Sequence, residues 1–552
     1  MHVFILRYNQ RIVNNFVELI FFIGKMVVSS CQTLKTLKIK VATMSYSPTL
    51  SSGFTSAKNR SVFISPQSGM CSFCTEDCAG TCELALAAIL GAQTVYPMTT
   101  GNNQIASEKD YPIDFSHFNI NGRVFGAQGV VENCEEATIF NVNLERSYGT
   151  FHPVKMSMPV ILPALMKLNW QDYFAGAAMA GVTCIIGEDA RNNDPKLKVT
   201  NGKIEEFPLL DKALNCFRQY YRGYGQIVVQ CNIEDNLMGV PQIALQKYGA
   251  EAIEIKFGQA AKGTQPVKRL RDIETAIARQ KLGDLVHPDP SDPAIQKAYR
   301  NGVCPNFNTY GRLPLWTEES LIAHIAKLRD WGAKNIYFKM AGYDKTDIER
   351  VLRIACKAKV DMITFDGAGG GSGYSPAKMM NEWSLPTVCL EDIVVRISTQ
   401  LKEEGETLPA LVMTGGFASE DQVFKGLAYG DGHMLAIGLC RAAMAAAMTG
   451  KNIGEQIKSG NVPERFKKYG STIEEIFCDL PDLRALYGTR ANDFPSGAIG
   501  VFSYLNKIAF GLRHFAALNR KFNLPLLDKS DLIPLTAEAK ALMADKWFMS
   551  PR

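Results

Sequence analysis

Residues 360–376 of this 552-residue chain read VDMITFDGAGGGSGYSP. The first six residues form a mostly apolar run that predicts a buried strand, and the residues after it are rich in glycine. Glycine at a strand end lets backbone N–H groups approach an anion with no side chain in the way. Gly415 and Gly416 end the next strand-like run, and Gly438 ends the one after it. Three successive strand ends that carry glycine predict a phosphate-binding site at the C-terminal face of a barrel.

Strand-like runs alternate with amphipathic stretches from about residue 151 onward, which is typical of βαβ units and a parallel sheet. The predicted strands are 159–165, 183–186, 226–231, 252–257, 335–340, 360–365, 410–414 and 434–437. Predicted helices include 318–331, 345–359 and 420–429, the last with Ser419 as its N-cap residue. Eight such units predict an α/β fold, a (β/α)8 TIM barrel, with residues 258–321 as a long polar insertion. A doubly wound sheet is the alternative, but the glycines on the late strands favour the barrel.

The chain is predicted to have four regions. Residues 1–43 are an N-terminal extension, 44–150 a cysteine-rich segment, 151–450 the barrel, and 451–552 a helical extension. We expect the last region, with a helix at 503–518, to pack on the barrel or on a partner subunit. Two interpretations of 1–43 remain open: the natural chain starts at Met44, or these residues form an amphipathic helix.

Composition and charge exclude several classes of protein. The net charge is +5, from 60 basic and 55 acidic residues, and no long basic run indicates nucleic-acid binding. The apolar stretch at 12–25 is too short and too charged to span a bilayer, and residues 28–30 make a poor signal-peptide cleavage site. We therefore expect a cytoplasmic protein that binds neither nucleic acid nor membrane and forms a homo-oligomer.

Four cysteines lie within twelve residues in the pattern C-x2-C-x3-C-x3-C, namely Cys71, Cys74, Cys78 and Cys82. Four thiolates on one short loop favour a [4Fe–4S] cluster. Zinc and disulfides are the alternatives, although structural zinc sites usually draw on two separate knuckles and nothing marks a secreted protein. The ten other cysteines are scattered, and most of them are expected to be small buried apolar residues.

Charged residues stand at several predicted strand ends. Lys256, Gln259 and Lys262 follow the fourth strand, and Lys339 lies near the end of the fifth between Phe338 and Met340. Glu188 follows the second strand. Cations at the mouth of a barrel suit an anionic ligand, and a buried lysine needs an anionic partner. Structural alternatives stay open: an architectural ion pair for Lys339, a helix N-cap for Glu188, and a solvated strand end for Lys256.

Two of these segments resemble glutamate synthase. Residues 370–376 are similar to the end of its FMN-binding loop, which typically reads HDGGTGASP, with Ser372 for threonine and Tyr374 for alanine. Residues 254–262 resemble the family's E-I-K-x-x-Q-G-A-K, with Ala260 for glycine. Residues 159–189 resemble the family's first two strands, and Lys339 falls at its strand-five lysine. The resemblance covers roughly residues 150–450.

The resemblance implies an FMN-dependent oxidoreductase. Lys339 would lie beside the flavin and stabilise charge on the reduced ring, while Glu188, Lys256, Gln259 and Lys262 would bind 2-oxoglutarate and its imine. The residues implied in binding FMN are Gly367, Gly370, Gly371, Ser372, Gly415, Gly416 and Gly438.

The chain also departs from the family's pattern. Ala368 and Gly369 stand in place of the His-Asp pair, and Cys440 alone remains of the C-x5-C-x4-C motif that holds a [3Fe–4S] cluster. The cluster at Cys71–Cys82 would then replace it and relay electrons from ferredoxin or another donor. We also expect no glutaminase domain, because neither Met1-His2 nor Met44-Ser45 provides the N-terminal cysteine that it needs. Ammonia would come from solution or from a partner subunit.

Three hypotheses follow. The first is a glutamate synthase-like enzyme that reduces 2-iminoglutarate to an amino acid. The second is an FMN barrel that acts on another amine or on another 2-oxo or 2-hydroxy acid, as in N-methylglutamate synthase. The third is a non-catalytic electron-transfer subunit.

Overall fold

The computed structural model describes residues 111–166, 168–188, 190–258, 268–270, 272–304, 306–368 and 383–544. Several sequence predictions lie outside these residues and stay predictions. They concern the extension 1–43, the cysteine cluster at 71–82, Gln259 and Lys262, and the loop residues Gly370, Gly371 and Ser372.

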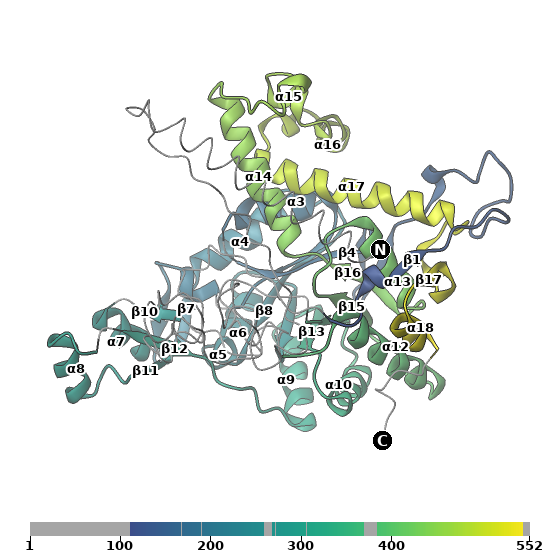
Figure 1. The fold of residues 1–552 in the computed structure, drawn as a ribbon. Coiled ribbons are helices and arrows are strands. Elements are labelled where there is room, and N and C mark those ends of the chain that lie inside the picture. Colours follow the sequence, from purple (N-terminus) through teal and green to yellow (C-terminus); the bar gives the residue numbers. More distant parts are fainter. Residues whose placement is uncertain are drawn as a thin grey trace, which may run out of the picture. The chain divides into compact units, whose positions relative to one another are not determined.

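Eight parallel strands close into a barrel, which confirms the predicted (β/α)8 fold (Figure 1). In chain order the strands are β4 (Val160–Leu165), β5 (Thr183–Ile186), β8 (Ile227–Cys231), β9 (Ala252–Lys256), β13 (Asn335–Ala341), β14 (Met362–Asp366), β15 (Ala410–Thr414) and β16 (Met434–Gly438). Strand β16 pairs back onto β4 and closes the ring. The largest deviation from the predicted bounds is at β14, which begins at Met362 rather than at residue 360. Asp361 therefore lies just before the strand. Its carboxylate accepts hydrogen bonds from the backbone N–H groups of Ile336 and Thr150, at 2.8 and 2.7 Å.

Alternate residues of the strands fill the barrel interior. A layer of apolar side chains crosses its middle, comprising Ile161, Ile185, Val228, Ala252, Tyr337, Met362, Val412 and Ala436. The N-terminal end of the barrel is plugged by a hairpin of β2 (Arg146–Tyr148) and β3 (Val154–Met156), whose Tyr148, Val154 and Met156 join the same cluster. The polar residues nearer the C-terminal strand ends therefore rest on a closed apolar floor.

Helices surround the barrel between successive strands. They are α3 (Trp170–Ala180), α4 (Pro208–Arg218), α5 (Ile233–Leu237), α6 (Val240–Gln246), α9 (Glu318–Asp330), α10 (Lys345–Ala358), α12 (Thr387–Glu403), α13 (Glu420–Tyr429) and α14 (Arg441–Lys458). The predicted bounds of α9, α10 and α13 hold to within one residue. Ser419 is the N-cap of α13 as predicted, and its backbone N–H donates to Gln422 Oε1 at 3.2 Å.

The insertion after β9 has a small fold of its own. Strands β10 (Lys268–Leu270), β12 (Phe307–Tyr310) and β11 (Leu285–His287) form an antiparallel sheet in that order. Helices α7 (Ile273–Lys281) and α8 (Pro293–Arg300) accompany it, and Leu270, Ile273, Ala276 and Phe307 form its core. The sequence predicts only a polar insertion, because strands of three or four residues leave too short an apolar pattern to recognise.

The C-terminal region is bound into the helical layer of the barrel. Helix α17 (Ser496–Leu518) begins seven residues before the predicted 503 and lies across α3 and α14 (Figure 1). Glycines make the close crossing possible: a Cβ on Gly450 would lie 2.6 Å from the Ser496 carbonyl oxygen, and one on Gly500 would lie 2.7 Å from that of Ala446. The predicted boundary between residues 450 and 451 falls inside α14.

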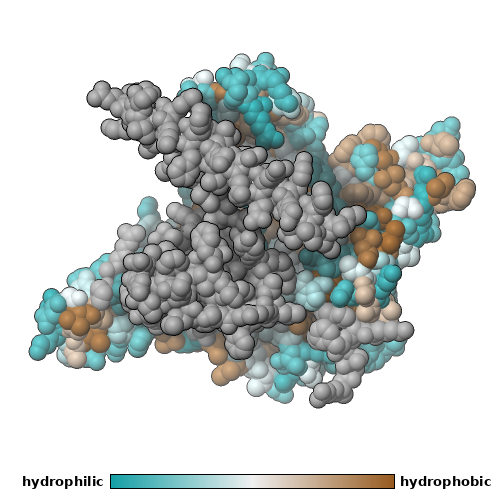
Figure 2. All heavy atoms as spheres, in the orientation of Figure 1, coloured by the Kyte–Doolittle hydropathy of each residue, from teal (hydrophilic) through white to brown (hydrophobic). Residues whose placement is uncertain are grey.

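Both ends of the described chain meet outside the barrel. Strand β1 (Phe118–Ile120) pairs antiparallel with β17 (Leu532–Pro534), next to α18 (Ala537–Met543). The remaining elements are the hairpin of β6 (Lys198–Thr200) and β7 (Lys203–Glu206), α15 (Ile473–Ile476), α16 (Leu480–Tyr487) and short 3-10 turns. Segment 121–141 exposes several apolar side chains, and Figure 2 shows apolar residues gathered at the edge of the molecule where this segment lies. In the part of the chain that the structure describes, we find no helix with the length and apolar content needed to cross a bilayer.

Candidate functional site

The C-terminal strand ends bring the predicted charged residues together. Strand β9 directs Ala252, Glu254 and Lys256 to one face because side chains alternate along a strand. Ala252 lies in the apolar layer of the interior, so Glu254 and Lys256 project into the barrel above it. Lys339 is opposite Lys256 on the neighbouring strand β13, and Thr364 of β14 is opposite Lys339.

Lys256 and Glu188 form a buried ion pair across the barrel mouth. Their side chains are 2% and 7% exposed, and the Lys256 ammonium donates to Glu188 Oε1. One sequence alternative is therefore wrong, because Lys256 is not a solvated strand end; the Glu188 carboxylate is paired with it. The pair joins the ends of strands two and four of the barrel.

Glu254 is a buried carboxyl that the sequence analysis did not select. It is 1% exposed and accepts a hydrogen bond from Gln230 Nε2 at 2.5 Å. Burial raises the pKa of Glu254 to about 7, although the nearby Lys339 and the Gln230 hydrogen bond act in the opposite direction. The signal was present in the sequence, since Glu254 stands two residues before Lys256 and period-two alternation places both on the same face.

Lys339 is buried in the same mouth, with 5% exposure. Burial by itself would lower its pKa, but the carboxylates of Asp366 and Glu254 outweigh that effect and raise it. Within the described residues Lys339 makes no direct hydrogen bond or ion pair, so the architectural ion pair considered for it is not found there. The hydroxyl of Thr364 beside it is also buried without a hydrogen-bond partner. A cation and a hydroxyl are thus available to a ligand.

Gly367 and Gly415 hold two strand ends in close contact. A Cβ on Gly415 would lie 2.6 Å from Thr387 Oγ1 and 2.7 Å from the Gly367 carbonyl oxygen, and φ of Gly415 is +126°. Thr387, at the start of α12, donates to the Gly415 carbonyl at 2.7 Å. Gly416 also has a positive φ of +95°. A side chain at either of the first two glycines would force the strand ends apart.

Gly438 is required for a different reason. A Cβ there would lie 2.7 Å from Pro163 Cγ and 2.8 Å from Thr414 Cβ, so its neighbours are side chains of the barrel interior. Thr414 donates to the Gly438 carbonyl at 3.1 Å. The glycine keeps β15, β16 and β4 close together at the mouth.

Comparison with known proteins places these residues in a family context. Residues 313–449 match the conserved region of glutamate synthase. This part of the chain is therefore similar to glutamate synthase. The match covers the last four strands of the barrel, and with them Lys339, Gly367, Gly415, Gly416 and Gly438. No curated protein sequence matches the chain.

Solved structures share only a remote likeness with this chain. A mutant of an active chimera of (S)-mandelate dehydrogenase is 13% identical, with 76% of this chain and 88% of that chain covered and a TM-score of 0.39. A flavocytochrome b2 variant with bound sulfite is 11% identical, with 79% and 83% covered and a TM-score of 0.42. Likeness at this level supports no statement about function.

The cysteines that the structure describes lie in several environments. Nine are described, and all are free thiols: Cys184, Cys231, Cys356 and Cys389 are buried, Cys216, Cys304 and Cys440 are partly buried, and Cys134 and Cys478 are exposed. The expectation that most would be buried is therefore wrong for this set. Within the described ranges, no three His, Cys, Asp or Glu side chains are grouped as a metal site would require.

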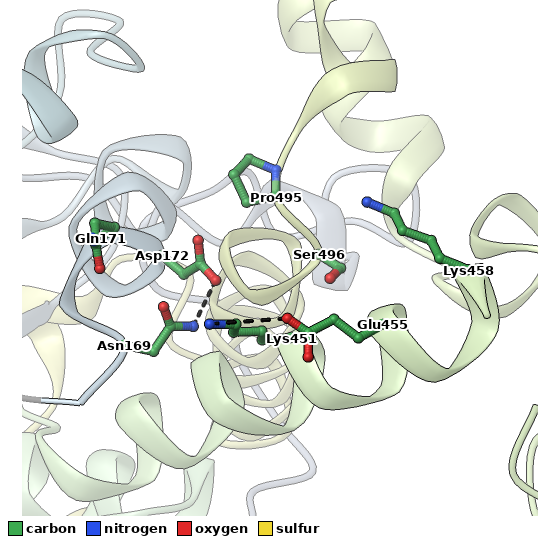
Figure 3. A pocket seen from close by; sticks show the side chains of 8 residues that line it. All are labelled: Asn169, Gln171, Asp172, Lys451, Glu455, Lys458, Pro495 and Ser496. Carbon is green, nitrogen blue, oxygen red and sulfur yellow. Dashed lines mark hydrogen bonds and ion pairs between the residues drawn. The ribbon is translucent and has the colours of Figure 1, made fainter. Parts of the chain in front are cut away.

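A separate polar pocket lies where α3, α14 and α17 meet (Figure 3). Its volume is about 340 Å³, and Asn169, Asp172, Lys451, Glu455 and Ser496 are among its lining residues. Burial raises the pKa of Asp172, which accepts a hydrogen bond from Asn169 Nδ2 at 2.6 Å and lies against Gly497 at the start of α17. A carboxyl at the N-terminal end of a helix is favourable. We therefore interpret Asp172 as a residue that stabilises the crossing of α3, α14 and α17.

Proposed function

We propose that this protein is an FMN-dependent oxidoreductase of the glutamate synthase type, which reduces an imine derived from a 2-oxo acid to an amino acid. The observation that carries the proposal is the match of residues 313–449 to glutamate synthase, because it spans Lys339 and the glycine-bearing strand ends. When bound, FMN supplies hydride transfer.

The residues at the barrel mouth fit such a cofactor. Gly367 and Gly415 leave no room for a Cβ, so these strand ends and Thr387 pack closely at the mouth, beside the loop proposed to hold the phosphate. Lys339 and the Thr364 hydroxyl have no direct partner among the described residues. We assign Lys339 to hold negative charge of the reduced cofactor. The cofactor-binding residues of the proposal are Gly367, Gly370, Gly371, Ser372, Gly415, Gly416 and Gly438.

The Lys256–Glu188 pair would bind the substrate. A 2-oxo diacid carries two carboxylates, and Lys256 offers a desolvated ammonium in a strand-end position, where charge-assisted bonds are strong. Glu188 would orient that ammonium, and Gln259 and Lys262 would complete the anion site. Glu254, with a pKa of about 7, would hold at its Oε atoms a proton for the nitrogen or oxygen of the substrate at neutral pH.

Electrons and nitrogen come from outside the barrel in this proposal. The cysteines Cys71, Cys74, Cys78 and Cys82 would hold a [4Fe–4S] cluster that passes electrons from ferredoxin or another donor. Ammonia would come from solution or from a partner subunit. The protein would act in the cytoplasm, as a homo-oligomer.

A second candidate is an FMN barrel for another amine or another 2-oxo or 2-hydroxy acid. It is favoured by one observation: Ala368 stands where glutamate synthase has a polar residue, and its side chain is buried. A loop that lacks the His-Asp pair would make different contacts with the substrate.

The test is anaerobic purification followed by a visible spectrum and by quantitation of FMN, iron and zinc. One FMN with about four iron atoms per chain supports the complete proposal. FMN with zinc and no iron would make the cysteine loop structural, and absence of flavin would refute the proposal. Glutamate formation from 2-oxoglutarate and ammonia with a reduced donor then separates the first candidate from the second.

A further inference from the structure

A buried network of charges joins the insertion to the barrel. Arg191 is 2% exposed and reaches Asp235 from Nε at 3.1 Å and Asp284 from Nη1 at 3.2 Å. Arg279 Nη2 lies 2.5 Å from the other oxygen of Asp284. Arg279 and Asp284 belong to the insertion, whereas Arg191 follows β5 and Asp235 lies in α5 after β8.

A second contact secures the return of the chain. The backbone N–H of Arg312 donates to Glu234 Oε1 at 2.7 Å, and its guanidinium pairs with the same carboxylate. Arg312 also donates to the Gly283 carbonyl at 3.2 Å, next to Asp284. The insertion is thus held to the ends of strands two and three at both of its sides.

These contacts are close in sequence to the pair that spans the barrel mouth. Arg191 is three residues after Glu188, and the insertion leaves the barrel directly after β9, which ends at Lys256. Glu188 therefore stands on one of the segments that the network connects, and Lys256 ends the strand from which the insertion leaves. The backbone N–H of Glu188 donates to Gln230 Oε1 over 3.4 Å, which is long for a hydrogen bond.

The network does not tolerate the loss of one member easily. Removing a partner from a buried ion pair leaves an uncompensated charge, and the surrounding structure moves to solvate it. Without the Asp284 carboxylate, Arg191 and Arg279 each lose one ion pair, and Arg191 keeps the pair with Asp235. The segment that starts at Glu188 would then shift with Arg191.

We propose that Asp284 is a positioning residue: by holding Arg191 it sets the Glu188–Lys256 pair, so that the insertion determines how tightly the barrel mouth binds its anionic substrate. The assignment of a 2-oxo acid to that pair rests on the proposed function, but the positioning of Glu188 by Asp284 does not.

The experiment compares Asp284→Asn with Asp289→Asn in the full-length protein as purified. Asp289 is an exposed residue of the same insertion, so its variant controls for a general disturbance of that subdomain. Amide hydrogen exchange is measured in peptides covering 187–194 and 272–287, and 2-oxoglutarate binding is measured as the dissociation constant. We expect Asp284→Asn to speed exchange in both peptides and to weaken binding about tenfold, with Asp289→Asn close to wild type.

Two further variants keep the result decisive. Asp284→Glu retains the charge and should restore much of the affinity and protection. Arg279→Gln removes the less buried partner of Asp284. It should give a smaller increase in exchange and a smaller loss of affinity. This variant keeps the test possible if Asp284→Asn does not fold. Faster exchange in 272–287 with no change in 187–194 would overturn the inference. Coupled exchange in both peptides, in a protein whose wild type does not bind 2-oxoglutarate, would support the positioning and refute the proposed substrate.

Discussion

The two ends of the barrel treat their buried polar groups in opposite ways. At the N-terminal end, Tyr148 bonds to Tyr337 and Thr183 at 2.8 Å each, Tyr337 donates to Gln226, and Gln226 donates to Asn335 at 3.0 Å. At the C-terminal end, Lys339 and Thr364 have no direct partner among the described residues, and Glu254 has a pKa far from its ordinary value. A satisfied network stabilises, whereas available polar groups cost stability and serve a ligand. The difference assigns stability to one end and chemistry to the other, as is general for this fold.

The largest expected effect comes from Lys339→Met. It removes a cation that we assign to the reduced cofactor, so turnover should fall about 100-fold or more while the fold is kept. The measurement is the steady-state rate with a reduced donor, beside circular dichroism. Lys334→Met is the matched control, because Lys334 lies five residues earlier and pairs with Glu251 at the surface. If both variants lost turnover equally, the loss would not be specific to Lys339. The contrast between the two ends of the barrel would then fail.

Gly415→Ala should be next in size. The new methyl group would meet Thr387 and Gly367 in a backbone with φ of +126°, at a cost of about 3 kcal/mol and with loss of bound flavin. Gly405→Ala is the control, since Gly405 has a φ of +90° with nothing within 4 Å of an added Cβ. The measurements are the ratio of flavin to protein and the urea midpoint of unfolding in both variants. If Gly405→Ala lost as much flavin, close approach at Gly415 would not be the cause.

Tyr337→Phe tests the opposite end. It leaves the Gln226 carbonyl and the Tyr148 hydroxyl each short of one hydrogen bond, so the free energy of unfolding should fall by about 2 kcal/mol. Flavin content and turnover should stay at the wild-type level, which equilibrium unfolding and steady-state kinetics together would establish. Tyr469→Phe, at an exposed position, controls for the change of residue type. A selective loss of turnover would show that the two ends are coupled.

Glu254→Gln comes last because its effect on stability depends on pH and is small near neutral pH. The pKa of Glu254 is raised from 4.5 to about 7, so its contribution to stability is fully present below about pH 4.5 and declines as the pH rises to about 7. The decline is at most about 1.4 kcal/mol per pH unit and should be absent in the glutamine variant. Urea unfolding at a series of pH values between about 4.5 and 7 measures it, with Glu251→Gln at the surface as control.

Turnover provides a second test of Glu254. If its protonated form donates to the substrate, the wild-type rate should fall as the pH rises through about 7, and this limb should be missing in Glu254→Gln. The same limb in both enzymes would assign the proton to another group.

Much of the barrel could be predicted because its strands are local apolar runs with turns between them. Lys256, Glu188 and Lys339 could be selected because charge at a strand end is visible in a single segment. Their pairing could not, since Lys256 and Glu188 meet across 68 positions of the chain. The same holds for Arg191 and Asp284, which are 93 positions apart, and for the tyrosine network at the N-terminal end. Contacts of this kind depend on barrel closure and on the small fold of the insertion, which short segments do not reveal.

The glycine-mediated crossing of α17 over α3 and α14 has a consequence for how the chain can be divided. Helix α17 buries Ala498, Ile499 and Val501 in the same core that holds the outer faces of α3 and α14. A protein shortened before Ser496 would present that apolar surface to solvent and should aggregate. The region from α14 through α17 is therefore an obligatory part of the folding unit, and fragments for expression or domain exchange should retain it.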